Sequence, residues 1–287
     1  MTMLGTHGDA YVFPGDICEK AMTAIAMVQT EDGFVLAADG RVRLDDDSRL
    51  TASPEMLAQE TDQQQKIFPI VRAGEAFAYA VTGNVRDPFG FDLLVAIEVQ
   101  NAALSQRKFE DFRSYLRILG GKVNRAINEA VTERTLEALP KFNRMETIPG
   151  WRIATLYACG YFNNTPYLGE IDFHHSRRDS QFDVKFHPPF STIVSGSQIV
   201  RRHMYGDDVR AARDPRFAKF VHDLGKNVSL EDAQQFARGY IEACSSALGL
   251  EVDEPICKGI GGHIHIATIS KEKGFTWVIE PLRKEIP

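Results

Sequence analysis

The sequence predicts an α+β domain in which strands and helices are layered, and three observations carry that prediction. Strand-like and helix-like segments come in blocks: strands, two helices, strands, a helix, and strands again. A doubly wound parallel sheet would need strict alternation of the two. No internal repeat, linker or low-complexity tract divides the 287 residues, which favours a single domain.

The first block opens with two short apolar runs. Residues 23–30 (TAIAMVQT) and 34–38 (FVLAA) are separated by Glu31-Asp32-Gly33, a tight-turn signal. Two apolar strands so close together predict a buried antiparallel hairpin.

A second strand pair follows a polar excursion. Residues 42–64 are mostly polar, with three consecutive aspartates, and we expect them at the surface. Residues 66–71 and 76–82 then read as strands joined by Arg72-Ala73-Gly74-Glu75.

The remaining elements follow from periodicity and capping signals. Two helices are expected over 88–104 and 110–136, and Gly120-Gly121 predicts a weak point or a break in the second. Another helix is expected from Ser229 to about Leu248, because Ser229 caps and Asp232 stands three positions on. Residues 206–228 look irregular. Strands are expected near 152–160, 165–173, 180–186 and 190–194, with a closing hairpin over 263–270 and 276–280.

Composition excludes several classes of protein. The formal net charge of -6 leaves no basic footprint, so we expect no nucleic-acid partner. No apolar run approaches the roughly 18 residues of a membrane span. The four cysteines have no CxxC spacing, which indicates reduced thiols and a cytoplasmic protein. Residues 1–22 lack the charged start and apolar stretch of a secretory signal.

A set of spaced residues carries a more specific signal. Thr23 heads the first strand, and Asp39 follows the return strand 16 positions later. Lys66 opens the next strand, and Gly83 ends the strand after it, with an aspartate close behind. Ser195 lies in the turn Val194-Ser195-Gly196-Ser197, and the chain closes with Gly261-Gly262-His263-Ile264-His265-Ile266-Ala267.

In this order the residues resemble a proteasome β subunit or HslV-type peptidase, of the bacterial proteasome-like branch of N-terminal nucleophile (Ntn) hydrolases. The resemblance covers about residues 23–282 and implies a four-layer αββα sandwich. It makes 1–22 an N-terminal extension or propeptide and 23–287 a single proteasome-like domain. It also implies a peptide or protein substrate, a homo-oligomeric ring, an ATPase or unfoldase partner, and no cofactor.

The resemblance assigns a role to each residue. Thr23 would be the nucleophile and, once N-terminal, would supply its own amine as base, since an α-amine has a pKa near 7.7–8.0. Lys66 would lower the pKa of amine and hydroxyl, and Asp39 would hold Lys66 charged. Gly83 would offer a backbone N–H to the oxyanion. Ser195 would position the amine or a water. Taken singly, each has a plainer interpretation as a strand end, a cap or a turn residue.

Two departures from the family pattern stand out. The stretch between Asp39 and Lys66 is longer than usual, so Lys66 matches by context rather than by spacing. The aspartate and serine that usually precede the final Gly-Gly are replaced by Cys257 and Ile260. Asp253 is an open candidate to replace the aspartate.

The route to a free Thr23 is also open. The preceding residue is Met22 rather than the glycine usual in self-processing precursors. Either the chain cleaves itself at Met22-Thr23, or Met22 is the true start and its removal exposes Thr23.

Other constellations are weaker. His174-His175 and the pair His263 and His265 supply too few ligands for a zinc site, and no metal is expected. Cys257 as a nucleophile and the glycines at 259–262 as a phosphate loop lack supporting context. The sequence thus favours a threonine-nucleophile hydrolase of peptide bonds. Two alternatives stay open: an inactive proteasome-like scaffold or binding subunit, and an Ntn amidase acting on a small amide.

Overall fold

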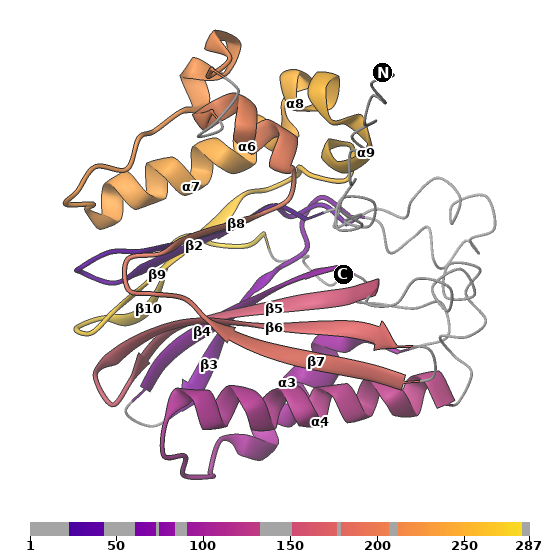
Figure 1. Cartoon of the computed structure of the whole chain (residues 1–287). Coiled ribbons are helices and arrows are strands. Elements are labelled where there is room, and N and C mark those ends of the chain that lie inside the picture. Colours follow the sequence, from indigo (N-terminus) through magenta and orange to yellow (C-terminus); the bar gives the residue numbers. More distant parts are fainter. Residues whose placement is uncertain are drawn as a thin grey trace, which may run out of the picture.

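Two five-stranded antiparallel sheets stack face to face, with helices covering both outer faces (Figure 1). The architecture comes from a computed structural model, which describes residues 23–42, 61–72, 75–83, 91–132, 151–176, 179–206 and 212–282. It is the α+β, four-layer αββα sandwich that the sequence predicted. Residues 1–22 and most of the polar excursion, 43–60, lie outside the described residues.

The first sheet has the strand order β10-β9-β2-β1-β8. Its tight β1–β2 hairpin depends on Gly33, whose φ of 152° is unfavourable for other residues. A Cβ at Gly33 would also lie 2.1 Å from the carbonyl oxygen of Ile269, so glycine lets the turn pack on β9. The strands are β1 (Ile25–Gln29), β2 (Phe34–Ala38), β8 (Thr192–Ser195), β9 (His265–Ser270) and β10 (Gly274–Ile279).

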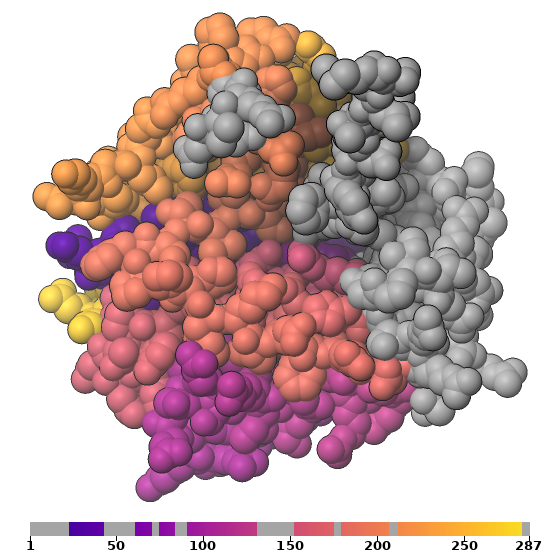
Figure 2. Space-filling model, in the orientation of Figure 1, coloured from indigo at the N-terminus to yellow at the C-terminus, as the bar shows by residue number. Residues whose placement is uncertain are grey.

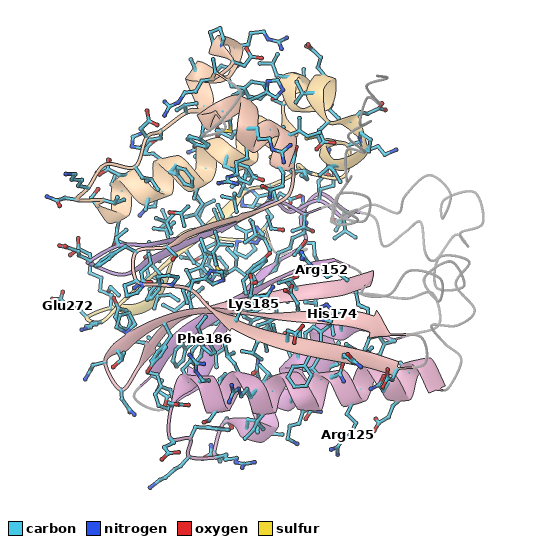
Figure 3. The ribbon with its side chains drawn as sticks, in the orientation of Figure 1. Arg125, Arg152, His174, Lys185, Phe186 and Glu272 are labelled. Atoms are coloured by element: carbon cyan, nitrogen blue, oxygen red, sulfur yellow. The ribbon has the colours of Figure 1, made fainter. Side chains whose placement is uncertain are left out.

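The second sheet has the order β3-β4-β5-β6-β7. Its outer face packs on α3 (Leu93–Leu104) and α4 (Phe112–Thr132). In the side-chain view, Phe186 lies on β7 beside α4, where it packs against Phe112 (Figure 3). The strands are β3 (Ile67–Arg72), β4 (Glu75–Gly83), β5 (Trp151–Phe162), β6 (Thr165–Ser176) and β7 (Asp179–Phe186).

Three apolar layers hold the sandwich together. One lies between α4 and the second sheet, one between the sheets, and one between the first sheet and α7. From outside, the magenta α4 and the orange helices form opposite faces of the molecule (Figure 2). The helices over the first sheet are α6 (Gln198–Tyr205), α7 (Leu230–Ser245), α8 (Ala247–Val252), α9 (Glu254–Cys257) and the short 3-10 helix Pro215–Phe220. No helix in the described ranges is long and apolar enough to cross a membrane.

A polar cluster fixes three strands of the second sheet. The buried carboxylate of Asp172 accepts hydrogen bonds of 2.6 Å from both Thr155 Oγ1 and Lys185 Nζ. Arg152, labelled with Lys185 in Figure 3, lies 3.5 Å from the same carboxylate. Thr155 lies on β5 and Lys185 on β7, so their hydrogen bonds to Asp172 link β6 to both neighbouring strands.

The sequence located most strands to within a few residues, but two predictions between 206 and 248 were wrong. The helix expected to reach Leu248 ends at Ser245, and α8 begins at Ala247, because the Ser246 hydroxyl caps the new helix at Gly249 N. The stretch 206–228, expected to be irregular, contains the 3-10 helix that Asp214 caps. The predicted capping box of Ser229 and Asp232 is confirmed.

The expected weak point at Gly120-Gly121 was also wrong, since α4 continues through both glycines. A Cβ at Gly120 would come within 2.7 Å of the Phe182 ring. The missing side chain lets α4 approach β7, so tertiary packing outweighs the poor helix propensity of glycine. At Gly121 the nearest atom would be 3.7 Å away, an ordinary contact.

The two adjacent glycines should therefore respond oppositely to alanine. Gly121→Ala should raise the free energy of unfolding by up to about 1 kcal/mol, through helix propensity alone. Gly120→Ala should lower it by about 1–3 kcal/mol, because the methyl group overpacks against Phe182. Urea unfolding of both variants tests this, and equal effects would contradict the packing argument.

Candidate functional site

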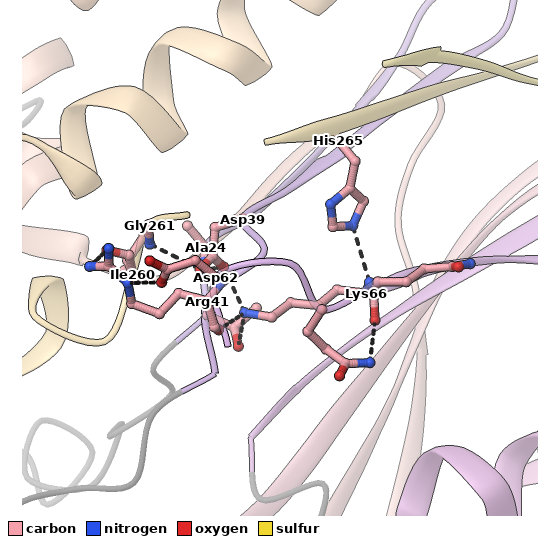
Figure 4. Close-up of polar contacts among 11 residues, drawn as sticks. Ala24, Asp39, Arg41, Asp62, Lys66, Ile260, Gly261 and His265 are labelled. Atoms are coloured by element: carbon pink, nitrogen blue, oxygen red, sulfur yellow. Dashed lines mark hydrogen bonds and ion pairs between the residues drawn. The ribbon is translucent and has the colours of Figure 1, made fainter. Parts of the chain in front are cut away.

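Thr23 lies two residues before β1, close to Lys66, which precedes β3, and to Asp39, which follows β2. Figure 4 shows the contact between Asp39 and Lys66. All three side chains are buried, with Asp39 completely inaccessible. Asp39 follows β2, and its backbone N–H donates to the carbonyl of Ala24, which continues the β1–β2 ladder to the site.

The carboxylate of Asp39 accepts four hydrogen bonds. Oδ1 accepts from the N–H of Ala24 and from Lys66 Nζ, both at 2.9 Å. Oδ2 accepts from the N–H of Arg41 at 3.1 Å and from the N–H of Gly261 at 3.0 Å. Each oxygen thus has two donors, and a protonated acid would have to give one up. The geometry therefore fits the ionised carboxylate.

The ammonium group of Lys66 has three acceptors for its three N–H bonds. It donates to Asp39 Oδ1, to the carbonyl oxygen of Arg41 at 2.6 Å, and to Thr23 Oγ1 at 3.1 Å. Because all three N–H bonds of the ammonium group are used, its orientation is fixed. One of the three bonds points at the Thr23 hydroxyl, so the positive charge lies next to that hydroxyl.

Burial and pairing act in opposite directions on these two groups. Burial lowers the pKa of Lys66 from its ordinary value, and the charge of Arg41 adds to this, whereas the charge of and hydrogen bond to Asp39 raise it. Burial raises the pKa of Asp39, against the attraction of Lys66 and the backbone donors. Since all the hydrogen-bonding positions are filled in the charged forms, we treat the pair as ionic near neutral pH.

A loop from the far end of the chain closes the site. Arg41 donates from Nε to Asp62 at 2.7 Å and from its guanidinium to the carbonyl of Ile260 at 3.1 Å. Gly261 has a φ of 147°, and a Cβ there would lie 2.8 Å from the guanidinium of Arg41. The glycine thus lets the loop approach closely enough for its N–H to reach Asp39.

The two other predicted site residues lie on neighbouring strands. Gly83 ends β4 with a φ of 109°, and the β3–β4 register places it at the end of the sheet where β3 begins. Ser195 ends β8 opposite Ile25, with its side chain near the hydroxyl of Tyr157. Burial raises the pKa of Tyr157 to about 12, so that hydroxyl stays protonated. No hydrogen bond joins Ser195 to Thr23 among the residues described.

Asp253, which the sequence left as an open candidate for the missing aspartate, forms a buried pair with Ser197 next to the turn at Gly196. Ser197 Oγ donates to Asp253 Oδ2 at 2.6 Å, and it also caps α6 by accepting from the N–H of Val200. A Cβ at Gly196 would be 3.3 Å from Cα of Ala24, so the turn packs against the residue that follows Thr23. Ser197 precedes a helix, and this cap position was the available sequence signal.

Cys257 and Ile260 stand where a carboxylate and a hydroxyl were expected. Both are buried in the apolar layer under α7, so they add no polar group to the site. Their backbone still matters, because the loop they lead into carries Gly261.

The histidines point to separate partners. His174 pairs with Asp183, His263 with the carbonyl of Glu280, and His265 with the backbone of Lys66. Within the described ranges, no three His, Cys, Asp or Glu side chains gather in a way that could hold a metal ion. Sequence reasoning rejected His265 as a metal ligand and missed its contact with Lys66.

Comparison with known proteins identifies the fold. No protein-family model matches the chain, and no curated protein matches it. Among solved structures, Anbu (ancestral beta-subunit) from Yersinia bercovieri is similar at a TM-score of 0.53 and 13% identity, over 90% of this chain and 87% of that one. The Anbu (Gly-1) mutant from Hyphomicrobium sp. strain MC1 has a TM-score of 0.49 and 15% identity, over 89% and 85%.

This finding corrects the family expected from the sequence. The assignment to the proteasome β-subunit and HslV-type branch was wrong, because the similar structure from Yersinia bercovieri is an Anbu protein, of a distinct proteasome-like family. Three of the residues behind the assignment, Thr23, Asp39 and Lys66, meet in this structure, but that contact does not separate one branch of the proteasome-like fold from another. What the chain has is a proteasome-like β-subunit fold.

The saturated carboxylate of Asp39 yields a stability prediction. Asp39→Asn should lower the free energy of unfolding by about 3–5 kcal/mol, because it leaves Lys66 charged without its partner and turns an amide NH₂ toward backbone donors. Asp183→Asn, which alters an exposed contact with His174, should change it by less than about 0.5 kcal/mol. Denaturant unfolding measures both, and a small loss in Asp39→Asn would mean that the carboxylate is not ionised.

Proposed function

We propose that this chain is a threonine-nucleophile hydrolase that cleaves amide bonds, with Thr23 as the nucleophile. One observation carries the proposal: Lys66 Nζ lies 3.1 Å from Thr23 Oγ1 while Asp39 and the Arg41 carbonyl hold it in place. A fixed cation beside a hydroxyl lowers the pKa of that hydroxyl. Such an arrangement has no evident structural purpose for a threonine at the head of a strand.

The site also limits which group can act as base. The ammonium of Lys66 carries all its protons, and both oxygens of Asp39 are occupied by donors. Neither can take the hydroxyl proton without breaking the arrangement. The remaining candidate is the α-amine of Thr23, which is free only when Thr23 begins the chain. The proposal therefore includes removal of residues 1–22.

The proposed reaction proceeds in two balanced steps. Thr23 Oγ attacks the substrate carbonyl while its proton passes to the amine, which then protonates the leaving nitrogen as the C–N bond breaks. Water, deprotonated by the same amine, hydrolyses the ester and restores the hydroxyl. We assign the oxyanion contact to the N–H of Gly83 and the positioning of amine or water to Ser195.

The proposed substrates are peptides. Substrate profiling would distinguish a peptidase from an amidase that acts on small amides. The proteasome-like fold is consistent with a homo-oligomeric ring that an ATPase or unfoldase would serve. One observation favours a second candidate, a non-catalytic subunit. Cys257 and Ile260, which stand where an aspartate and a serine were expected, are buried and apolar. The buried pair of Ser197 and Asp253 beside the site supports catalysis instead, as a substitute polar network.

Exposure of Thr23 should create activity, and Thr23→Ala should abolish it. The chain would be produced both complete and beginning at Thr23, with intact mass confirming each start. A β-lactone probe that acylates nucleophilic hydroxyls should label only the chain that starts at Thr23, and peptide reporters should be cleaved at least about 10²-fold more slowly by Thr23→Ala.

Thr23→Ser should keep part of the activity, and Thr276→Ala, an exposed change on β10, should leave it intact. Absence of labelling and hydrolysis in the chain that starts at Thr23 would favour the non-catalytic subunit.

Activity should also depend on pH in two limbs. On the acid side the rate should fall as the amine becomes protonated, at a pH below the ordinary α-amine value of about 7.7 because the charge of Lys66 lowers that pKa. At high pH it should fall as Lys66 loses its proton, and this limb should lie below the ordinary lysine value of 10.5 because burial lowers the pKa of Lys66. A kcat/KM profile from pH 5 to 11 tests both limbs. An alkaline limb at or above 10.5 would contradict the lowered pKa of Lys66, and a rate that stays level up to pH 11 would contradict a role for its charge.

A further inference from the structure

His265 is a buried titratable side chain that the proposed reaction does not use. It lies at the start of β9, 1% exposed, on the same strand face as Ala267 and Ile269, which pack between the sheets. Figure 4 shows its ring pointing from β9 toward the backbone of Lys66, where Nε2 lies 3.1 Å from the Lys66 nitrogen.

The hydrogen bond joins the two sheets at the site. His265 belongs to the first sheet, whereas Lys66 leads directly into β3, an edge strand of the second. The N–H of Lys66 is buried, and a buried N–H without an acceptor is costly. His265 supplies that acceptor across the gap between the sheets.

The contact requires a neutral imidazole. Since Nε2 accepts the N–H of Lys66, the ring proton must be on Nδ1, which makes no well-formed hydrogen bond with any described residue. Burial, together with the charges of Lys66 and His263, lowers the pKa of His265 to about 3, against a weaker opposing interaction with the His263 backbone. The rings of His265 and Trp277 form a T-shaped contact, and Trp277 adds no charge.

We propose that His265 is a positioning residue for Lys66: it fixes the backbone from which the ammonium reaches Thr23 and Asp39. Lys66 is then held at two points. Its ammonium group donates to Thr23 and Asp39, and its backbone N–H donates to His265 on β9. The importance of this for turnover rests on the proposed function. The anchoring itself does not, and can be measured separately.

Two variants separate the acceptor from mere bulk. His265→Leu fills much of the space but cannot accept a hydrogen bond, whereas the side-chain oxygen of His265→Gln can reach the place of Nε2. In the chain that starts at Thr23, kcat should fall by up to about 10²-fold in His265→Leu, as misplacement by about 1 Å can cost that much, with KM little changed. His265→Gln should recover most of kcat. His263→Gln, which loses the ring contact with the carbonyl of Glu280 and keeps the His265 side chain, is the matched control.

Crystal structures of the variants provide a readout independent of activity. In His265→Leu the distance from Lys66 Nζ to Thr23 Oγ1 should lengthen beyond hydrogen bonding, and His265→Gln should restore it. An unmoved Lys66 in His265→Leu overturns the proposal. A displaced Lys66 combined with a wild-type chain that neither labels nor hydrolyses would instead reject the hydrolase function and leave the anchoring in place.

Nitrogen-15 NMR of the wild-type imidazole covers the case in which His265→Leu does not fold. A proton on Nδ1 and none on Nε2 is expected down to about pH 4, given the lowered pKa. Because an unfolded histidine takes up its proton near 6.5, the stability owed to neutral His265 should be present above that pH and lost as pH falls toward 3. The excess stability of wild type over His265→Gln should therefore shrink across this window. Titration of His265 near 6.5, or a proton on Nε2, overturns the proposal.

Discussion

The buried ion pair of Asp39 and Lys66 is the interaction on which the rest of the site depends. Two charges removed from water cost several kcal/mol each unless hydrogen bonds replace the lost solvation. Here every position is filled: four donors meet the carboxylate, and three acceptors meet the ammonium. The pair is tolerable only because the backbone around it is placed to supply those groups.

That requirement explains several features of the fold. The donors to Asp39 come from the β1–β2 hairpin and from a loop more than 200 residues later, at Gly261. Gly261 must lack a side chain to let the loop pass Arg41. Lys66 enters from the opposite sheet, so the apolar layer between the sheets determines whether the ammonium arrives at the right place. A change in how the two sheets pack would therefore first change the distance between the Lys66 ammonium and the Asp39 carboxylate.

Local patterns made much of this predictable. Two short apolar runs and the turn at Gly33 located the first hairpin, and the resemblance of the Thr23–Asp39 spacing to that of proteasome-type hydrolases located half of the site. Lys66 came only from its context at the head of a strand. What failed were consequences of packing. The fit of Gly120 against Phe182 reverses the expected helix break, and nothing near His265 in sequence indicates Lys66, which is 199 residues away. The assignment to a family branch was wrong for a related reason. Residues that support a fold do not distinguish the families that share that fold.

The filling of every hydrogen-bonding position around Lys66 and Asp39 has one more consequence. In the proposed mechanism these side chains are already in their working arrangement before a free amine exists at Thr23. Activation would then require no rearrangement of the site, only the breaking of one peptide bond. Such a switch works in one direction: no ligand or change of pH rejoins the bond. Control over this protein would therefore be exerted once in the lifetime of each molecule, at the moment of cleavage, and not by any later equilibrium.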